Sequence, residues 1–96
     1  MGKSVPELLR SAAQTYEERH KLYGDNYKHF GKCMKGIFPE PLTIETEEEW
    51  VRVGLILNIV TKVTRYGQNL KKGGHQDSIH DASVYCSMLE EMTDGN

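Results

Sequence analysis

The stretch EEEWVRVGLILNIVTKVTR, residues 47–65, decides the fold. From residue 50 to residue 63 it is apolar on nearly every side, and only Gly54 and Asn58 resemble turn residues. A run of this length is too long for a strand, so it predicts a helix ending near Tyr66, at the centre of a bundle or of an oligomer. Thr46 and Glu49 have the spacing of a capping box at its start.

The sequence on either side predicts three more helices. Ser4 and Glu7 form a second capping box, which opens a helix over about 4–21. After a YGDN turn, apolar residues at helical spacing predict a helix over about 26–37, and the prolines of FPEPL end it. The last helix is expected to start at residue 77 or 78, with one apolar face made by Ile79, Ala82, Cys86 and Leu89. We therefore predict an all-α fold of about four helices.

Composition limits the architecture and the partners. Ninety-six residues supply one modest core, so we expect a single domain, 1–96, with an ordered core of about 4–92. Burial between subunits would enlarge that core, which favours a homo-oligomer, either a dimer or a tetramer. A net charge of −2 gives no bulk attraction to DNA or to a membrane.

The same composition bears on localisation. No apolar run reaches the ~18 residues that span a bilayer, and the first residues lack a signal peptide's apolar region. Cys33 and Cys86 lie far apart without CxxC spacing, so we interpret them as small buried hydrophobic residues in a reducing compartment. These features predict a cytoplasmic protein.

Two polar stripes mark the candidate site. The first runs along the end of the central helix with spacings of four, three and four, at Asn58, Lys62, Arg65 and Asn69. The second opens the last helix with spacings of four and four, at Asp77, Asp81 and Tyr85. The connection 67–76 is short enough to return the chain antiparallel, so the two cations should approach the two carboxylates.

This cluster has two interpretations. In the structural one, Ser78 and Asp81 form a variant capping box, Asp77 favours the helix N-terminus, and Lys62 and Arg65 pair with the carboxylates. In the functional one, the cations bind phosphate while Asp77 and Asp81 orient them or hold Mg²⁺. Ionic groups on a core helix are costly unless they are paired, which makes the cluster informative.

Aromatic residues near the YGDN turn add a second candidate element. Tyr23, Tyr27, His29 and Phe30 supply flat rings that can stack on a nucleobase, although such rings more often belong to the core or to turns. Tyr85 is a further candidate for a contact with the base or sugar. No P-loop, Rossmann motif or paired histidine spacing for zinc is present in the sequence.

Three segments together resemble a known family. YGDNY followed by phenylalanine, KVTR at the end of an apolar helix, and DSIHDASVY resemble small phage and prophage proteins of unknown function. That family looks remotely similar to the all-α nucleotide pyrophosphohydrolases of the MazG and dUTPase-like group. The resemblance covers about residues 16–90 and implies a MazG-like bundle, completed by oligomerisation, that handles nucleotides.

The sequence departs from the hydrolytic relatives at the metal site. In those enzymes, ExxE and ExxD pairs hold Mg²⁺ against the phosphates, and a metal-activated water attacks. Here the corresponding helix interior carries Asn58, Thr61, Lys62 and Arg65. Only Asp77 and Asp81 remain as candidate catalytic residues and magnesium ligands. Two cations can neutralise phosphate directly, so the sequence supports binding more than hydrolysis.

Three hypotheses follow. The first is a phage-type protein that binds a nucleotide or related phosphate ligand, with hydrolysis of a nucleoside triphosphate as its enzymatic form. The second is a non-catalytic counter-defence sponge that sequesters a host signalling nucleotide, such as a cyclic one. The third is a helical protein-interaction module. For the first two, the predicted ligand-binding residues are Asn58, Lys62, Arg65, Asn69, Tyr23, Tyr27 and Tyr85.

Overall fold

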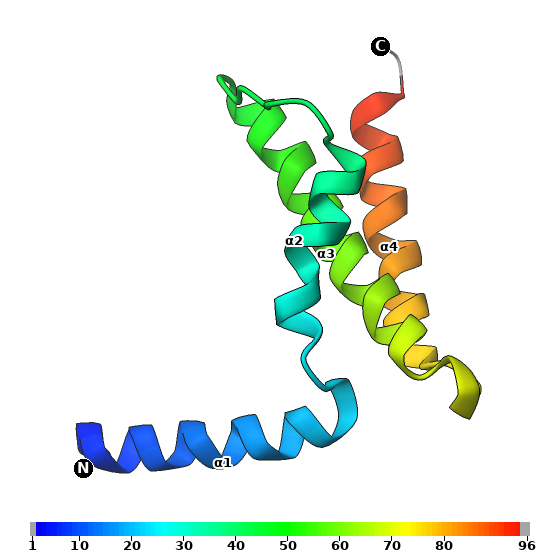
Figure 1. The fold of residues 1–96 in the computed structure, drawn as a ribbon. Coiled ribbons are helices and arrows are strands. Elements are labelled where there is room, and N and C mark those ends of the chain that lie inside the picture. The colour runs from blue at the N-terminus through cyan, green and yellow to red at the C-terminus, as the bar shows by residue number, and fades with distance from the viewer. Residues whose placement is uncertain (1, 95–96) are drawn as a thin grey trace.

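The computed structural model describes residues 2–94, and these form an all-α fold (Figure 1). The helices of this part of the chain are α1 (Val5–Tyr23), α2 (Asn26–Ile37), α3 (Glu47–Gln68) and α4 (Gln76–Thr93), with a short 3-10 turn, η1 (Leu70–Lys72), before α4. The expected all-α class with about four helices is confirmed. The expected bounds of α2 agree with the structure, and those of the other helices differ by one to two residues.

Side-chain caps start α1 and α3 as expected. The hydroxyl of Thr46 accepts a hydrogen bond from the Glu49 backbone N–H at 3.1 Å, and the Glu49 carboxylate accepts one from the Thr46 N–H at 3.1 Å. Hydrogen bonds from Thr46 hold the pKa of the Glu49 carboxyl below its ordinary value. At α1, the Ser4 hydroxyl accepts from the Glu7 N–H at 3.4 Å. Both capping residues were therefore identified correctly.

The start of α4 differs from the expectation. The cap is His75, whose Nδ1 accepts from the Ser78 N–H at 3.2 Å and lies 2.6 Å from the Ser78 hydroxyl oxygen. Because His75 caps the helix, the capping pair of Ser78 and Asp81 in the structural interpretation is wrong, and α4 begins one or two residues earlier than expected. An imidazole nitrogen can accept as a carboxylate does, but histidine is not a common N-cap.

The buried face of α4 is also rotated from the expected one. Ser78 and Ala82 are buried, whereas the predicted core positions Ile79 and Cys86 are exposed. Two of the expected face residues, Ala82 and Leu89, do lie inward. The two cysteines are free, as expected, but Cys86 is exposed and Cys33 only partly covered, so the prediction that both are buried is wrong.

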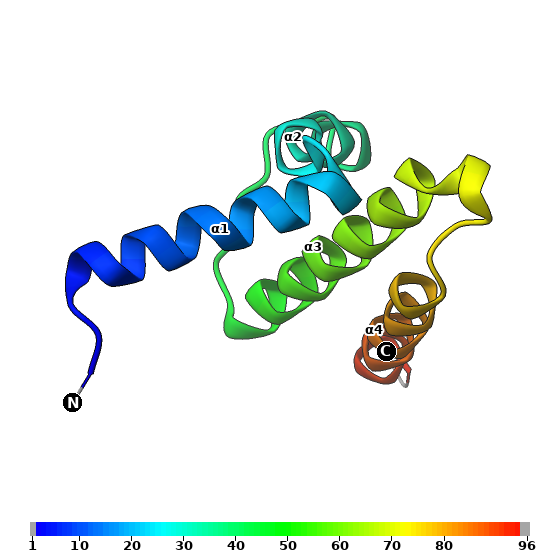
Figure 2. The ribbon, with the colours of Figure 1, turned by 90° about the horizontal axis from the view of Figure 1, so that it is seen from below.

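Helices α2 and α4 pack against α3, which lies between them (Figure 2). The central position expected for this helix is confirmed. Few side chains are enclosed, however: in residues 2–94, the buried hydrophobic residues are Val60 on α3 and Ala82 on α4. The core of one chain is therefore very small and lies along the α3–α4 contact.

Helix α1 projects from this body (Figure 1). None of its residues is buried. The radius of gyration is 16.7 Å, whereas a compact chain of this length has about 12.5 Å. The extended shape comes from a helix that makes few contacts with its own chain.

Glycines shape both connections that matter for the site. Gly24, between α1 and α2, has a φ of 56° and a ψ of −139°, a conformation that other residues rarely adopt. Gly74, between η1 and α4, has a φ of 86°, and the ring of Tyr66 occupies the place where a Cβ would stand. No helix of the described residues is long and apolar enough to cross a membrane.

Candidate functional site

Lys62 pairs with Asp81 across the contact between α3 and α4. Its Nζ lies 3.2 Å from Oδ2 of Asp81, and only 19% of the lysine side chain is exposed. This is one of the contacts expected from the two polar stripes. The carboxylate neutralises a largely covered ammonium group, so the pair has a clear structural role.

Arg65, three residues later, faces a different neighbour. The carbon at the centre of its guanidinium group lies 4.5 Å from the centre of the Tyr23 ring, a cation–π contact between α3 and the end of α1. Among residues 2–94, no carboxylate forms an ion pair with Arg65. Its Nε is buried and has no hydrogen-bond partner there. The arginine charge is thus available to a ligand in a way that the lysine charge is not.

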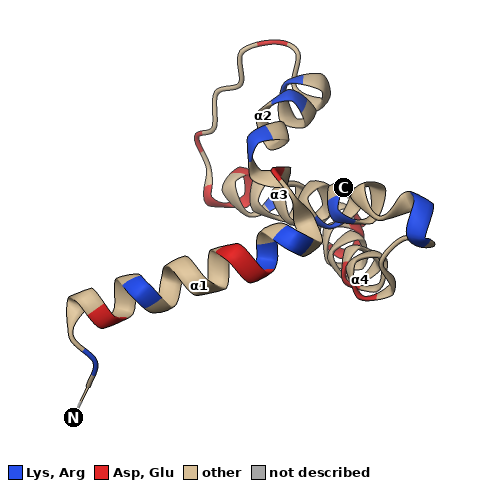
Figure 3. Ribbon diagram, turned by 60° about the horizontal axis from the view of Figure 1, so that its bottom comes forward, with Lys and Arg blue, Asp and Glu red and all other residues tan. Residues whose placement is uncertain are grey.

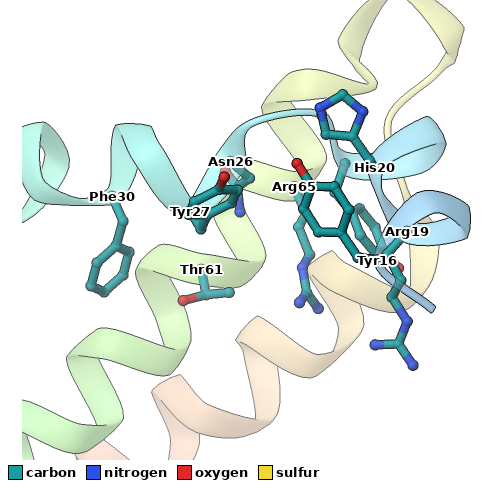
Figure 4. Close-up of a pocket in the computed structure, with 10 residues that line it drawn as sticks. Tyr16, Arg19, His20, Asn26, Tyr27, Phe30, Thr61 and Arg65 are labelled. Carbon is teal, nitrogen blue, oxygen red and sulfur yellow. The ribbon is translucent and has the colours of Figure 1, made fainter. Parts of the chain in front are cut away.

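A pocket lies beside Arg65, where the end of α1, the start of α2 and the second half of α3 meet (Figure 4). We call it the corner pocket. Its volume is about 320 Å³, and it is open to solvent. Its lining consists of aromatic, cationic and small polar residues, namely Tyr16, Arg19, His20, Tyr23, Gly24, Asn26, Tyr27, Phe30, Thr61 and Arg65.

The chemistry of this lining is distinctive. Four aromatic side chains and two guanidinium groups line one cavity, and no carboxylate does. In Figure 4 the guanidinium ends of Arg19 and Arg65 extend to the same side of the view. Figure 3 shows that basic residues mark the end of α1 that lies against α3. Such a lining suits an anion attached to a flat or apolar group.

The pocket wall depends on hydrogen bonds across the turn between α1 and α2. The imidazole Nε2 of His20 donates to the Asp25 carboxylate at 3.1 Å, and Lys28 Nζ lies 3.7 Å from the same oxygen. The hydrogen bond from His20 is the main cause that lowers the pKa of Asp25. These contacts connect the end of α1 to the start of α2 across the turn.

Tyr16 and Tyr27 join the same two helices from inside the pocket. A hydrogen bond with the Tyr27 side chain is the main cause that raises the pKa of the Tyr16 phenol, and partial burial is the second cause. That phenol is therefore neutral at physiological pH and can donate or accept a hydrogen bond. The Tyr16 and His20 rings also lie 5.5 Å apart between centres.

The structure separates the residues proposed from the sequence. Arg65, Tyr23 and Tyr27 line the corner pocket. The remaining members of the predicted set, Asn58, Lys62, Asn69, Asp77, Asp81 and Tyr85, lie outside its lining.

Two of these outlying residues bond to their own helix. The Asn58 amide donates to the Gly54 carbonyl and the Asn69 amide to the Arg65 carbonyl, both at 2.9 Å. Asp77 is exposed in the first turn of α4, and Tyr85 is partly buried on the same helix. The candidate ligand site therefore lies on the α1–α2 side of α3 rather than between α3 and α4.

The predicted magnesium pair can be tested against its surroundings. Asp81 already accepts the charge of Lys62 at 3.2 Å. Within residues 2–94, no group of three or more histidine, cysteine, aspartate or glutamate side chains is placed to share a metal ion. Because one oxygen of the predicted pair is already occupied by a cation, no step below passes through a metal.

Several lining residues were not predicted. Tyr16, Arg19 and His20 recur at helical spacing with the predicted Tyr23 on one face of α1, and that pattern was the available signal. Thr61 and Phe30 complete the lining from α3 and α2. The pattern alone could not show that this face of α1 meets Arg65, because that depends on the turn at Gly24.

Comparison of the chain with protein-family models, with curated proteins and with solved structures found no match.

Proposed function

We propose that this protein binds a nucleotide or a related phosphate-bearing ligand in the corner pocket. The observation that supports the proposal most strongly is the lining itself, in which Arg19 and Arg65 share one cavity with four aromatic side chains and no carboxylate. Arginine binds phosphate through two parallel hydrogen bonds, and aromatic rings stack on bases. This combination matches both ends of a nucleotide.

The volume of the corner pocket and the buried Nε of Arg65 agree with this proposal. A cavity of about 320 Å³ lies at the lower end of the ~300–1,000 Å³ range of small-molecule sites. The buried Nε of Arg65 has no partner in the described part of the chain, and an unsatisfied buried donor costs about 1–3 kcal/mol. Ligand binding that moves this side chain would give the donor a partner and offset that cost.

The proposal includes a setting for the protein. We place it in the cytoplasm, in agreement with its free cysteines, and expect it to act as a homo-oligomer. Its resemblance to small phage proteins of unknown function, which look remotely similar to the MazG-like group, favours a nucleotide over other phosphate compounds. Because Asp81 is paired with Lys62, we propose binding without cleavage as the activity of the pocket.

The test is retention of an intact ligand. Purified protein is incubated with nucleoside mono-, di- and triphosphates and with cyclic dinucleotides, with and without Mg²⁺, and then separated from free ligand. Mass spectrometry after denaturation identifies what was bound. We expect one class of nucleotide to be recovered unchanged.

Two matched variants locate the site. Arg65→Gln should weaken binding ~10-fold or more, because a charge-assisted contact to phosphate is lost. Lys62→Gln removes a cation from the same helix but outside the pocket, so it should lower stability and leave affinity unchanged. Thermal unfolding of both variants separates loss of binding from loss of folding.

Other outcomes would overturn the proposal. Equal losses of affinity in both variants would mean that the ligand binds at the α3–α4 contact. Appearance of monophosphate and pyrophosphate, abolished by Asp81→Ala, would identify a hydrolase. If no nucleotide is retained, the helical interaction module becomes the better hypothesis.

A further inference from the structure

Helix α1 carries an apolar stripe that its own chain leaves largely exposed. Val5, Leu8, Leu9, Ala12 and Tyr16 follow one another at helical spacing. Val5 is 68% exposed, Leu8 53% and Leu9 66%. We call these five residues the α1 stripe. The opposite side of the helix, around Gln14, is polar.

The whole chain exposes more surface than a monomer of its size. Its accessible surface is 7749 Å², whereas a compact monomer of 11.0 kDa exposes about 5,600 Å². The excess of roughly 2,100 Å² per chain corresponds to about 4,200 Å² for two chains, within the ~2,000–5,000 Å² of obligate homodimers. The exposed surface therefore has the size of a permanent interface.

The small core points to the identity of the partner. With Val60 and Ala82 as the buried hydrophobic residues of the described chain, a single copy has little to hold it folded. A partner needed for folding must be available whenever the chain is made. A second copy meets that condition, and each copy brings the same excess of exposed surface to a two-fold interface.

We infer that the α1 stripe is the surface through which two copies of this chain associate. The inference rests on the homo-oligomer included in the proposed function, but it does not require a ligand. Tyr16 belongs both to the stripe and to the lining of the corner pocket. A second copy seated on the stripe therefore borders the pocket and contributes to its wall.

Ligand-free protein provides the test. Sedimentation across micromolar concentrations should give a dimer or a multiple of it for the wild type. Leu9→Glu places a carboxylate in the stripe and should shift the mass to that of a monomer. Gln14→Glu adds the same charge on the opposite side of α1 and should leave the assembly intact.

A second measurement covers the case in which Leu9→Glu fails to fold. A photo-crosslinking amino acid in place of Leu9, in otherwise unchanged protein, should join two copies on illumination. The same group in place of Gln14 should not. A monomeric wild type, or a dimer that Leu9→Glu leaves intact and position 9 does not crosslink, would overturn the inference. Because no nucleotide is present, these results do not depend on the ligand proposal.

Discussion

The contact between α3 and α4 and the corner between α1 and α2 use similar residues for different ends. At the α3–α4 contact, Lys62 meets a carboxylate at 3.2 Å, and Ala82 and Val60 are enclosed. At the corner, Arg65 meets the face of an aromatic ring, and the surrounding side chains leave a cavity of about 320 Å³. Two cations one helical turn apart thus have unlike surroundings.

The difference shows how partners decide the role of a charge. A cation paired with a carboxylate has its charge balanced within the protein and mainly stabilises the fold. A guanidinium stacked on a ring keeps its donors free for another acceptor. Variants of the first region should therefore change stability, and variants of the second should change binding. The following experiments test that division, from the largest expected effect to the smallest.

Ala82→Leu should lower the free energy of unfolding more than the other variants. The residue is 4% exposed at the α3–α4 contact, and extra methylene groups in such a place cost up to about 3 kcal/mol. Chemical denaturation should show a lower free energy of unfolding. Ser83→Leu adds the same side chain at the exposed neighbouring position and should change the free energy of unfolding little. Equal effects would mean that the contact is not the core of the fold.

Gly74→Ala should cost about 2 kcal/mol, because a positive φ disfavours a side chain and the Tyr66 ring occupies its place. Gly31→Ala is the matched control: Gly31 lies within α2 with open space beside it, so alanine there should stabilise by up to about 1 kcal/mol. Thermal unfolding compares the two variants. Opposite signs would confirm that the return into α4 depends on this glycine.

The Lys62–Asp81 pair should contribute about 1 kcal/mol, since one partner is largely covered and the other is about half exposed. A double-mutant cycle with Lys62→Gln and Asp81→Asn measures the coupling. The same cycle applied to ligand affinity should give no coupling. If the coupling energy in ligand affinity were as large as that in stability, the α3–α4 contact would take part in ligand binding, contrary to the division between the two regions.

The variant Asp25→Asn, at the turn beside the corner pocket, should change stability the least. Its hydrogen bond from His20 lowers its pKa below 3.8. The contribution of the carboxylate to stability is therefore full above that value and is lost as the pH falls through the lowered pKa. The melting temperatures of wild type and Asp25→Asn should differ near neutral pH and converge in acid. A gap that stays constant would show that the carboxylate does not hold the turn.

The helices were largely predictable because local signals determine them. The capping residues at Ser4 and Thr46 and the glycine turn at Gly24 marked three boundaries. The cap of α4 was missed because histidine rarely takes that role. The buried face of α4 was misjudged because hydrophobicity placed Ile79 inward, whereas the small residues Ser78 and Ala82 allow the close approach to α3.

The candidate site was harder to predict. Helical spacing placed Lys62 near Asp81, and the structure has that contact. Spacing could not reveal that Arg65 turns toward Tyr23, because the two residues meet only through the angle between α1 and α2. That angle depends on one glycine and a few polar contacts. Side chains of α1 therefore entered the pocket without an obvious signal in the sequence.

Because Gly24 joins α1 to the rest of the molecule, a small rotation there moves the far end of α1 by a much larger distance. The 19 residues of α1 form a rod about 28 Å long, attached to the body at that glycine. A rotation of about 10° at the joint moves the far end of the rod sideways by about 5 Å. A small adjustment beside the corner pocket is thus magnified at Val5, so the position of any helix packed along the far half of α1 depends on the conformation of this one glycine.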